Sequence, residues 1–171
     1  MIIFDFDQTL VDTSSVENLR AARNWKAVMA RASQLPLYDG ITELIQELHD
    51  SGQTIAIVTK SPDMVPKAFI KAHGWPIDIV VGYHHVKNRK PHPEGLLLAM
   101  SKAGATADDT YHVGDQAQDT EASRSANIIA VGSAWGCLDT SELELSKPDV
   151  MCASIAELRD YFCAELGLTL A

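Results

Sequence analysis

The chain has 171 residues, of which 46% are hydrophobic and 22% are charged, and its formal net charge is −9. This composition is ordinary for a globular protein and excludes an intrinsically disordered chain. The acidic balance argues against nonspecific nucleic-acid binding, because such binding needs clustered Lys and Arg. We expect one domain over residues 1–171.

The start of the chain, MIIFDFDQTL, carries no basic leader followed by a long apolar run. No later stretch approaches the roughly 20 apolar residues that span a bilayer. We therefore expect a cytoplasmic protein without a membrane partner. The cysteines, Cys137, Cys152 and Cys163, are odd in number and form no CxxC pair, which favours reduced, structural thiols.

Short apolar runs rich in Ile and Val recur along the chain and are the candidate strands. In chain order they are residues 2–6, 54–59, 78–82, 110–114 and 128–132, with a short one at 149–152. Between them, apolar residues repeat at helical spacing over 41–48, 97–103 and 155–162. This alternation predicts an α/β protein with a Rossmann-like parallel sheet flanked by helices.

Residues 12–37 interrupt that alternation with a helical pattern longer than a plain crossover needs, and we interpret them as a small helical cap insertion. Ser14 and Glu17 have the spacing of a capping box at the start of one long amphipathic helix. On the wheel of that helix, apolar residues occupy one face and three arginines the other: Arg20, Arg23 and Arg31. The arginines are either a solvated surface or a guide for anionic substrates.

The first strand ends in the sequence DFDQT, which places two carboxylates at its carboxyl end. Strand alternation puts Asp5 and Asp7 on the same side, at the edge where open α/β sheets bind ligands. Two neighbouring carboxylates stay ionised together only if a cation lies between them or one keeps its proton. A bound Mg²⁺ would satisfy this requirement.

Three later features fall at turns near the same edge. Thr59 and Lys60 follow the second strand and open a helix, where a hydroxyl and backbone N–H groups suit an anion. Lys90 precedes a proline and offers a point charge to a phosphate oxygen. Asp115 ends the fourth strand and Asp119 follows one helical turn later, which supplies two more carboxylates for an oxygen-ligated cation.

These features resemble, in order, the four motifs of the haloacid dehalogenase superfamily, and within it the phosphoglycolate phosphatase-like branch with a reduced cap. The motifs are DxDxT at 5–9, a hydroxyl residue at Thr59, Lys90, and GDxxxD at 114–119. The resemblance implies a phosphatase that uses Asp5 as its nucleophile and forms an aspartyl-phosphate. By the same resemblance Asp7 would act as general acid and base, because an acid at this position indicates phosphatase or phosphomutase chemistry.

The resemblance also implies that Thr59, Lys60 and Lys90 bind the transferring phosphoryl group, with Lys90 offsetting the charge of Asp5. Two positions depart from the family pattern: Gln8 stands where a small Gly is frequent, and Lys60 stands where Asn is frequent. Gln8 is expected to crowd or polarise the mouth of the site.

The metal ligands follow from the same resemblance. Mg²⁺ would be held by Asp5, by the backbone carbonyl of Asp7 and by Asp115. Thr9 and Asp119 would orient these ligands. Whether Asp115 or Asp119 contacts the ion directly stays open.

The chain is therefore predicted to be a Mg²⁺-dependent phosphatase that hydrolyses phosphate monoesters. The small insertion 12–37 predicts an open site that accepts bulky or nucleotide-like phosphate esters, or one that a neighbouring subunit completes. Two alternatives are a phosphomutase of the same superfamily and a non-catalytic or receiver-like phosphate-binding module. The motif order argues against a receiver, whose acidic pair lies on the first strand and whose phosphorylated Asp ends an internal one.

Other conspicuous residues receive structural interpretations. His84 and His85 are expected on a surface loop, and His112 is expected to be packed or hydrogen-bonded inside a strand. Trp135 lies in a loop after the fifth strand, and this loop should border the active-site edge.

Overall fold

The structure is a computed structural model that describes residues 1–168, and its centre is a sheet of six parallel strands. The strands are β1 (Ile2–Phe4), β2 (Ile55–Val58), β3 (Ile79–Val81), β4 (Tyr111–Gly114), β5 (Ile129–Ser133) and β6 (Val150–Cys152). Their order across the sheet is β3-β2-β1-β4-β5-β6. The chain therefore winds to one side of β1 first and to the other side afterwards.

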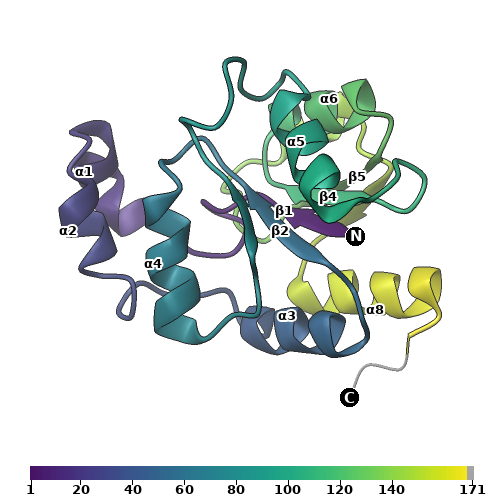
Figure 1. Cartoon of the computed structure of the whole chain (residues 1–171), viewed down its shortest axis with the longest axis horizontal. Helices are drawn as coiled ribbons and strands as arrows, with labels where there is room; N and C mark the ends of the chain where they lie inside the picture. The colour runs from purple at the N-terminus through teal and green to yellow at the C-terminus, as the bar shows by residue number, and fades with distance from the viewer. Residues whose placement is uncertain (169–171) are drawn as a thin grey trace.

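Helices cover both faces of the sheet (Figure 1). One face carries α3 (Ile41–Asp50) and α8 (Ile155–Leu166), and the other carries α5 (Glu94–Ala103) and α6 (Ala117–Ser125). α4 (Met64–His73) shares the apolar core of α3 and α8, and the short α7 (Ser141–Ser146) packs against α6. The sheet is thus the middle of three layers.

The period of two along a strand accounts for these layers. In β1, Ile2 and Phe4 pack in the core shared with α3 and α8, whereas Ile3 between them packs with α5 and α6. All three side chains are fully buried. A short run without a polar residue is typical of a parallel strand covered on both faces.

The predicted α/β class with a Rossmann-like parallel sheet is confirmed. Every predicted strand is present; β5 begins and ends one residue later than predicted, and the others are one or two residues shorter. Within the described part of the chain, none of the helices combines the length and the apolar character needed to cross a membrane.

Residues 12–37 do not form the one long helix that the sequence predicted. They form a short 3-10 helix, η1 (Ser14–Val16), and two short helices, α1 (Glu17–Ala21) and α2 (Trp25–Met29). The break lies at Arg23, whose φ of 54° belongs to the left-handed region that does not continue a helix. Asn24 then begins α2, because its side chain accepts a hydrogen bond from the Ala27 N–H (3.2 Å).

The capping box predicted at Ser14 and Glu17 is also wrong. Neither η1 nor α1 begins with a side-chain cap, and the Ser14 N–H donates instead to Asp12 Oδ1 (2.9 Å). The insertion packs sideways onto α4, with a contact of 2.8 Å between His73 Nε2 and the Ala32 carbonyl oxygen. Figure 1 shows α1 and α2 beside α4, away from the central strands.

Candidate active site

The carboxyl ends of β1, β2 and β4 meet at one edge of the sheet. Because β2 and β4 flank β1 on opposite sides, the connections of the chain diverge at this point. Such a switch point leaves a crevice where open α/β sheets bind ligands. Asp5 follows β1, Thr59 follows β2 and Asp115 follows β4, so the sheet brings together residues far apart in the sequence.

Lys90 joins two carboxylates at this edge. Its Nζ lies 2.7 Å from Asp5 Oδ1 and 2.6 Å from Asp119 Oδ1, and all three side chains are largely covered from solvent. Burial alone would lower the pKa of Lys90, but the charges of Asp119 and Asp5 outweigh burial and raise that pKa. A permanently charged ammonium group therefore lies against the side chain of Asp5.

The carboxylates of Asp5, Asp115 and Asp119 form a cluster whose ligand atoms lie within 4.8 Å of one another. Burial, and after it the charges of Asp5 and Asp119, raise the pKa of Asp115. Thr9 Oγ1 donates a hydrogen bond to Asp115 Oδ1 over 3.4 Å. Three buried carboxylates, two of which pair with Lys90, form a donor set that suits a hard, oxygen-ligated cation such as Mg²⁺. The Asp7 carboxylate is not part of this cluster.

The side chain of Asp7 contacts other groups. Ser61 Oγ donates to Asp7 Oδ2 over 3.1 Å, and Arg20 Nη2 lies 2.7 Å from the same oxygen. Asp7 Oδ1 is buried without a hydrogen-bond partner among residues 1–168. Burial raises the pKa of Asp7. The positive charge of Arg20 lowers this pKa and the negative charge of Asp5 raises it, and the net result is an increase. A raised pKa suits a group that gives and takes a proton. The contact of Ser61 with Asp7 was not predicted from the sequence.

The start of α6 fixes the position of Asp119. Gln116 and Asp119 form a reciprocal capping box, in which Asp119 Oδ2 accepts a hydrogen bond from the Gln116 N–H (3.0 Å). Gly114 leaves the room for this carboxylate, since a Cβ at that position would lie 2.5 Å from Asp119 Cγ. Both oxygens of Asp119 are thus engaged, one by Gln116 and one by Lys90.

The loop after β5 is tied to the first motif, as the sequence predicted for Trp135. Trp135 Nε1 donates to the Thr9 carbonyl oxygen (3.0 Å), and a Cβ on Gly136 would lie only 1.8 Å from the Gln8 carbonyl oxygen. Gln8 itself has a φ of 60°, in the left-handed region. Glycine adopts this conformation more easily than other residues, which explains why Gly suits this position. Its side chain accepts a hydrogen bond from the Tyr38 hydroxyl (2.7 Å).

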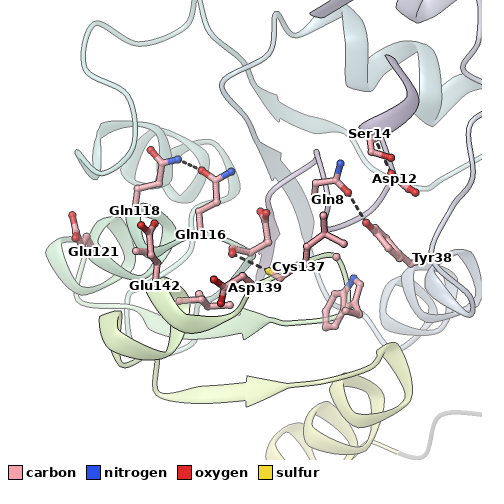
Figure 2. Close-up of a pocket in the computed structure, with 16 residues that line it drawn as sticks. Gln8, Asp12, Ser14, Tyr38, Gln116, Gln118, Glu121, Cys137, Asp139 and Glu142 are labelled. Carbon is pink, nitrogen blue, oxygen red and sulfur yellow. Dashed lines mark hydrogen bonds between the residues drawn. The ribbon is translucent and has the colours of Figure 1, made fainter. Parts of the chain in front are cut away.

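An open cleft of about 990 Å³ lies beside Asp115 (Figure 2). Gln8 and Tyr38 line one part of it, and the segment after β5, which includes Trp135, lines another. None of the lining residues is Lys or Arg. The acidic lining residues are Asp12, Asp115, Glu121, Asp139 and Glu142. This acidic side of the site was not predicted from the sequence, because it is assembled from separate segments.

The predicted phosphate-binding residues lie together on another side of the site. Thr59, Lys60 and Lys90 border one small recess, together with Arg89. Thr59 Oγ1 accepts a hydrogen bond from the Ser61 N–H (3.0 Å), whereas Lys60 is exposed. Arg89 was not singled out in the sequence; its guanidinium lies 3.5 Å from the centroid of the Tyr83 ring.

The predicted basic face of the insertion is wrong. Arg20 reaches Asp7 and also pairs with the exposed Glu17 (2.6 Å). Arg23 lies at the break between α1 and α2, and Arg31 follows α2, and both are exposed. Because the helix is broken, these arginines do not share a helical wheel, and only Arg20 contacts a predicted site residue.

His112 lies under the site and is packed and hydrogen-bonded, as predicted. Its Nδ1 lies 2.8 Å from Ser123 Oγ, and that hydroxyl donates its proton to the Asp119 carbonyl oxygen (2.7 Å). Ser123 Oγ therefore accepts from Nδ1–H, and Nε2 is left buried without a partner among the described residues. Burial, followed by the charge of Lys90, lowers the pKa of His112 to about 3.

The remaining structural interpretations agree with the structure. His84 and His85 are exposed on the loop after β3. The thiols of Cys137, Cys152 and Cys163 are free, and Cys152 is buried.

A family model described as "Haloacid dehalogenase-like hydrolase" matches residues 16–132. The matched range contains Thr59, Lys90, Asp115 and Asp119, and it begins after the first motif.

Similar curated proteins are named as phosphatases. "Probable phosphatase IndB" of Dickeya dadantii is 35% identical over 161 residues, which are 90% of this chain and 70% of that protein. "Pyrophosphatase PpaX" of Listeria monocytogenes and "Phosphoglycolate phosphatase" of Salmonella paratyphi A are each 32% identical over 124 residues, which are 71% of this chain. The aligned region spans 57% and 49% of these two relatives, about half of their length.

Solved structures share the fold. A hydrolase from Pseudomonas syringae has a TM-score of 0.80 at 22% identity, with 95% of this chain and 97% of that chain covered. CbbY of Rhodobacter sphaeroides, solved in complex with xylulose 1,5-bisphosphate, has a TM-score of 0.75 at 18% identity, with 92% and 95% covered. At these identities the likeness shows the arrangement of strands and helices alone.

Proposed function

Because the chain belongs to the haloacid dehalogenase-like hydrolase family and is a phosphatase of that family, we propose that it hydrolyses phosphate monoesters with Asp5 as the nucleophile. The observation that carries this proposal is the 2.7 Å contact between Lys90 Nζ and Asp5 Oδ1 at the ligand-binding edge of the sheet. A buried ammonium group beside a carboxylate offsets its negative charge and can also bind a phosphoryl oxygen.

In the first step, a carboxylate oxygen of Asp5 attacks phosphorus and forms an aspartyl-phosphate, while the bond from phosphorus to the ester oxygen breaks. Lys90, the Thr59 hydroxyl and the backbone N–H groups at the start of the following turn would hold the non-bridging oxygens. Lys60 lies at the rim of the same recess and would add positive charge there. In the second step, water attacks the aspartyl-phosphate and releases inorganic phosphate.

Asp7 is the proposed general acid and base. It would give a proton to the leaving alcohol oxygen in the first step and take one from the attacking water in the second. Its raised pKa and the hydrogen bond from Ser61 (3.1 Å) support this role, since the first favours a proton on the carboxyl group and the second fixes its orientation.

We further propose that Asp5, Asp115 and the backbone carbonyl of Asp7 hold Mg²⁺. When bound, Mg²⁺ supplies positive charge that offsets the carboxylates and the phosphoryl oxygens. Asp119, whose oxygens are engaged by Gln116 and Lys90, would orient the site and is the weaker candidate for direct ligation. Thr9 would hold Asp115 in place through its hydroxyl.

The substrate is proposed to be a phosphorylated compound that enters a site with little cover. The insertion contributes a short 3-10 helix, η1, and two helices of five residues each, α1 and α2, and the cleft beside Asp115 is open. These features support bulky or nucleotide-like esters and disfavour a phosphomutase, which would need a larger cap to grip a sugar.

Phosphate release from a panel of phosphate esters, with Mg²⁺ and with EDTA, tests the proposal. Asp5→Asn should abolish release and leave the thermal unfolding transition cooperative, because the amide is nearly isosteric with the carboxylate but is a poor nucleophile. The matched control is Asp139→Asn, which removes a carboxylate from the nearby cleft and should keep activity. Normal release by the Asp5→Asn protein would reject the mechanism.

A further inference from the structure

We propose that Arg20 determines substrate specificity by binding a second anionic group, a carboxylate, on the alcohol part of the ester. This inference rests on the proposed function and names the class of substrate for the same site. It starts from the ion pair between Arg20 Nη2 and Asp7 Oδ2 (2.7 Å), which joins the insertion to the proposed general acid.

The contact with Arg20 occupies one oxygen of the Asp7 carboxylate. Asp7 Oδ2 is occupied by Arg20 and by Ser61, and Asp7 Oδ1 is enclosed without a partner. For Asp7 to face the ester oxygen of a substrate, the guanidinium must give up at least part of this contact. A partly buried guanidinium that loses its carboxylate needs another anion, because burying an unpaired charge is costly.

Arg20 is placed to make such an exchange. Its side chain is 21% exposed, so it reaches solvent as well as Asp7. Its other partner, Glu17, is 64% exposed, and an ion pair of this kind contributes little stability. The five donors of a guanidinium can grip a carboxylate or a phosphate with two parallel hydrogen bonds.

The other basic residues at the site have roles of their own, because Lys60 borders the recess of Thr59 and Lys90 that is proposed to hold the transferring phosphoryl group. Lys90 is held between Asp5 and Asp119, and Arg89 is stacked on Tyr83. The cleft on the Asp115 side presents Asp12, Asp139 and Glu142 with no Lys or Arg among its lining residues. An anionic leaving group would be repelled from that cleft and attracted toward the insertion.

Three two-carbon phosphate esters that differ in charge test the inference: 2-phosphoglycolate, ethyl phosphate and O-phosphoethanolamine. The alcohol parts carry a carboxylate, no charge and an ammonium group, respectively. Wild-type protein should show the highest kcat/KM for the carboxylate ester. Arg20→Gln should lower kcat/KM for that ester by about 10- to 100-fold relative to ethyl phosphate, the range expected for a hydrogen-bonded charge pair.

Arg20→Lys keeps the charge but loses the planar fork, so it should retain an intermediate preference. Arg23→Gln and Arg31→Gln are the matched controls, because these arginines belong to the same insertion and are exposed. Both controls should keep the wild-type ratios. If Arg20→Gln does not fold, the wild-type preference and the Arg20→Lys ratios decide the question.

Three outcomes overturn the inference: no preference for the carboxylate ester in the wild type, equal losses on all three esters in Arg20→Gln, or a preference for the ammonium ester. Equal losses would mean that Arg20 only positions Asp7. If no ester is cleaved, or if Asp5→Asn remains active, the proposed function itself fails, and this result is distinct from a change in selectivity.

Discussion

The strand-end cluster of Asp5, Lys90, Asp115 and Asp119 and the insertion 12–37 differ in what fixes their shape. Asp5 and Asp115 follow two paired strands, so the ladder between β1 and β4 sets their separation. The helices α1 and α2 of the insertion are five residues long and would be marginal alone, so their positions depend on the packing of α1 against α2 and of α2 against α4. We therefore propose that the paired strands carry the catalytic chemistry and that the insertion influences substrate choice.

Lys90→Met should produce the largest effect, because the cluster depends on one cation. The change leaves Asp5 and Asp119 buried without their shared partner, which typically destabilises a protein by about 3–5 kcal/mol. Activity should fall by about 1,000-fold or more, as for other single cations that stabilise a transferring phosphoryl group. Phosphate release and urea unfolding measure the two effects.

Lys67→Met is the control for this change. Lys67 pairs with Asp63 on the surface at 2.5 Å, and its loss should change stability by less than about 1 kcal/mol. Similar losses in the two variants would show that the strand-end cluster has no special energetic role.

Asp7→Asn tests the residue where the two regions meet. Turnover of an alkyl phosphate should fall by about 100- to 10,000-fold, since proton transfer to the leaving oxygen and from water is lost. With 4-nitrophenyl phosphate the leaving oxygen needs no proton, so the variant should still release a burst of nitrophenolate before slow turnover. An equal loss of burst and steady-state rates would argue against Asp7 as the proton donor.

The sequence indicated that Asp5, Lys90, Asp115 and Asp119 would lie near one edge of the sheet, because each follows an apolar run or lies in a recognisable motif, and the structure places them there. It did not predict the break at Arg23, since the left-handed φ there interrupts a pattern that is otherwise helical. Side-chain contacts between distant segments, such as Ser61 to Asp7, leave no local signal in the sequence. The acidic cleft was missed for the same reason, as its lining comes from several separate loops.

We expect the stability of the folded protein to depend on pH through His112, which lies beneath the cluster. Its pKa is lowered to about 3 in the folded protein from an unfolded value near 6.5, so the unfolded state takes up a proton first as pH falls. This contribution to stability is complete above pH ~6.5 and is lost progressively toward pH ~3. Between pH 6 and 4.5 the loss from this group should approach about 2 kcal/mol.

Chemical unfolding of the His112→Phe variant and of the wild type, at several pH values and in EDTA, measures the contribution of His112 to the free energy of unfolding. The variant should be less stable near neutral pH but should show a shallower decline with acid. The exposed His49→Gln should decline in parallel with the wild type. A parallel decline for His112→Phe would mean that the buried imidazole does not resist protonation.

The smallest effect is expected in the insertion, from Asn24→Ala. Asn24 Oδ1 accepts the Ala27 N–H at the start of α2, and loss of such a cap costs about 1 kcal/mol. Because α2 packs on α4, the thermal midpoint should fall by a few degrees while turnover of ethyl phosphate stays near wild type. Asn24→Asp keeps the cap and should keep the wild-type midpoint. If Asn24→Ala instead reduced turnover of ethyl phosphate as strongly as Asp7→Asn, the insertion would have to be part of the catalytic machinery and not only of substrate selection.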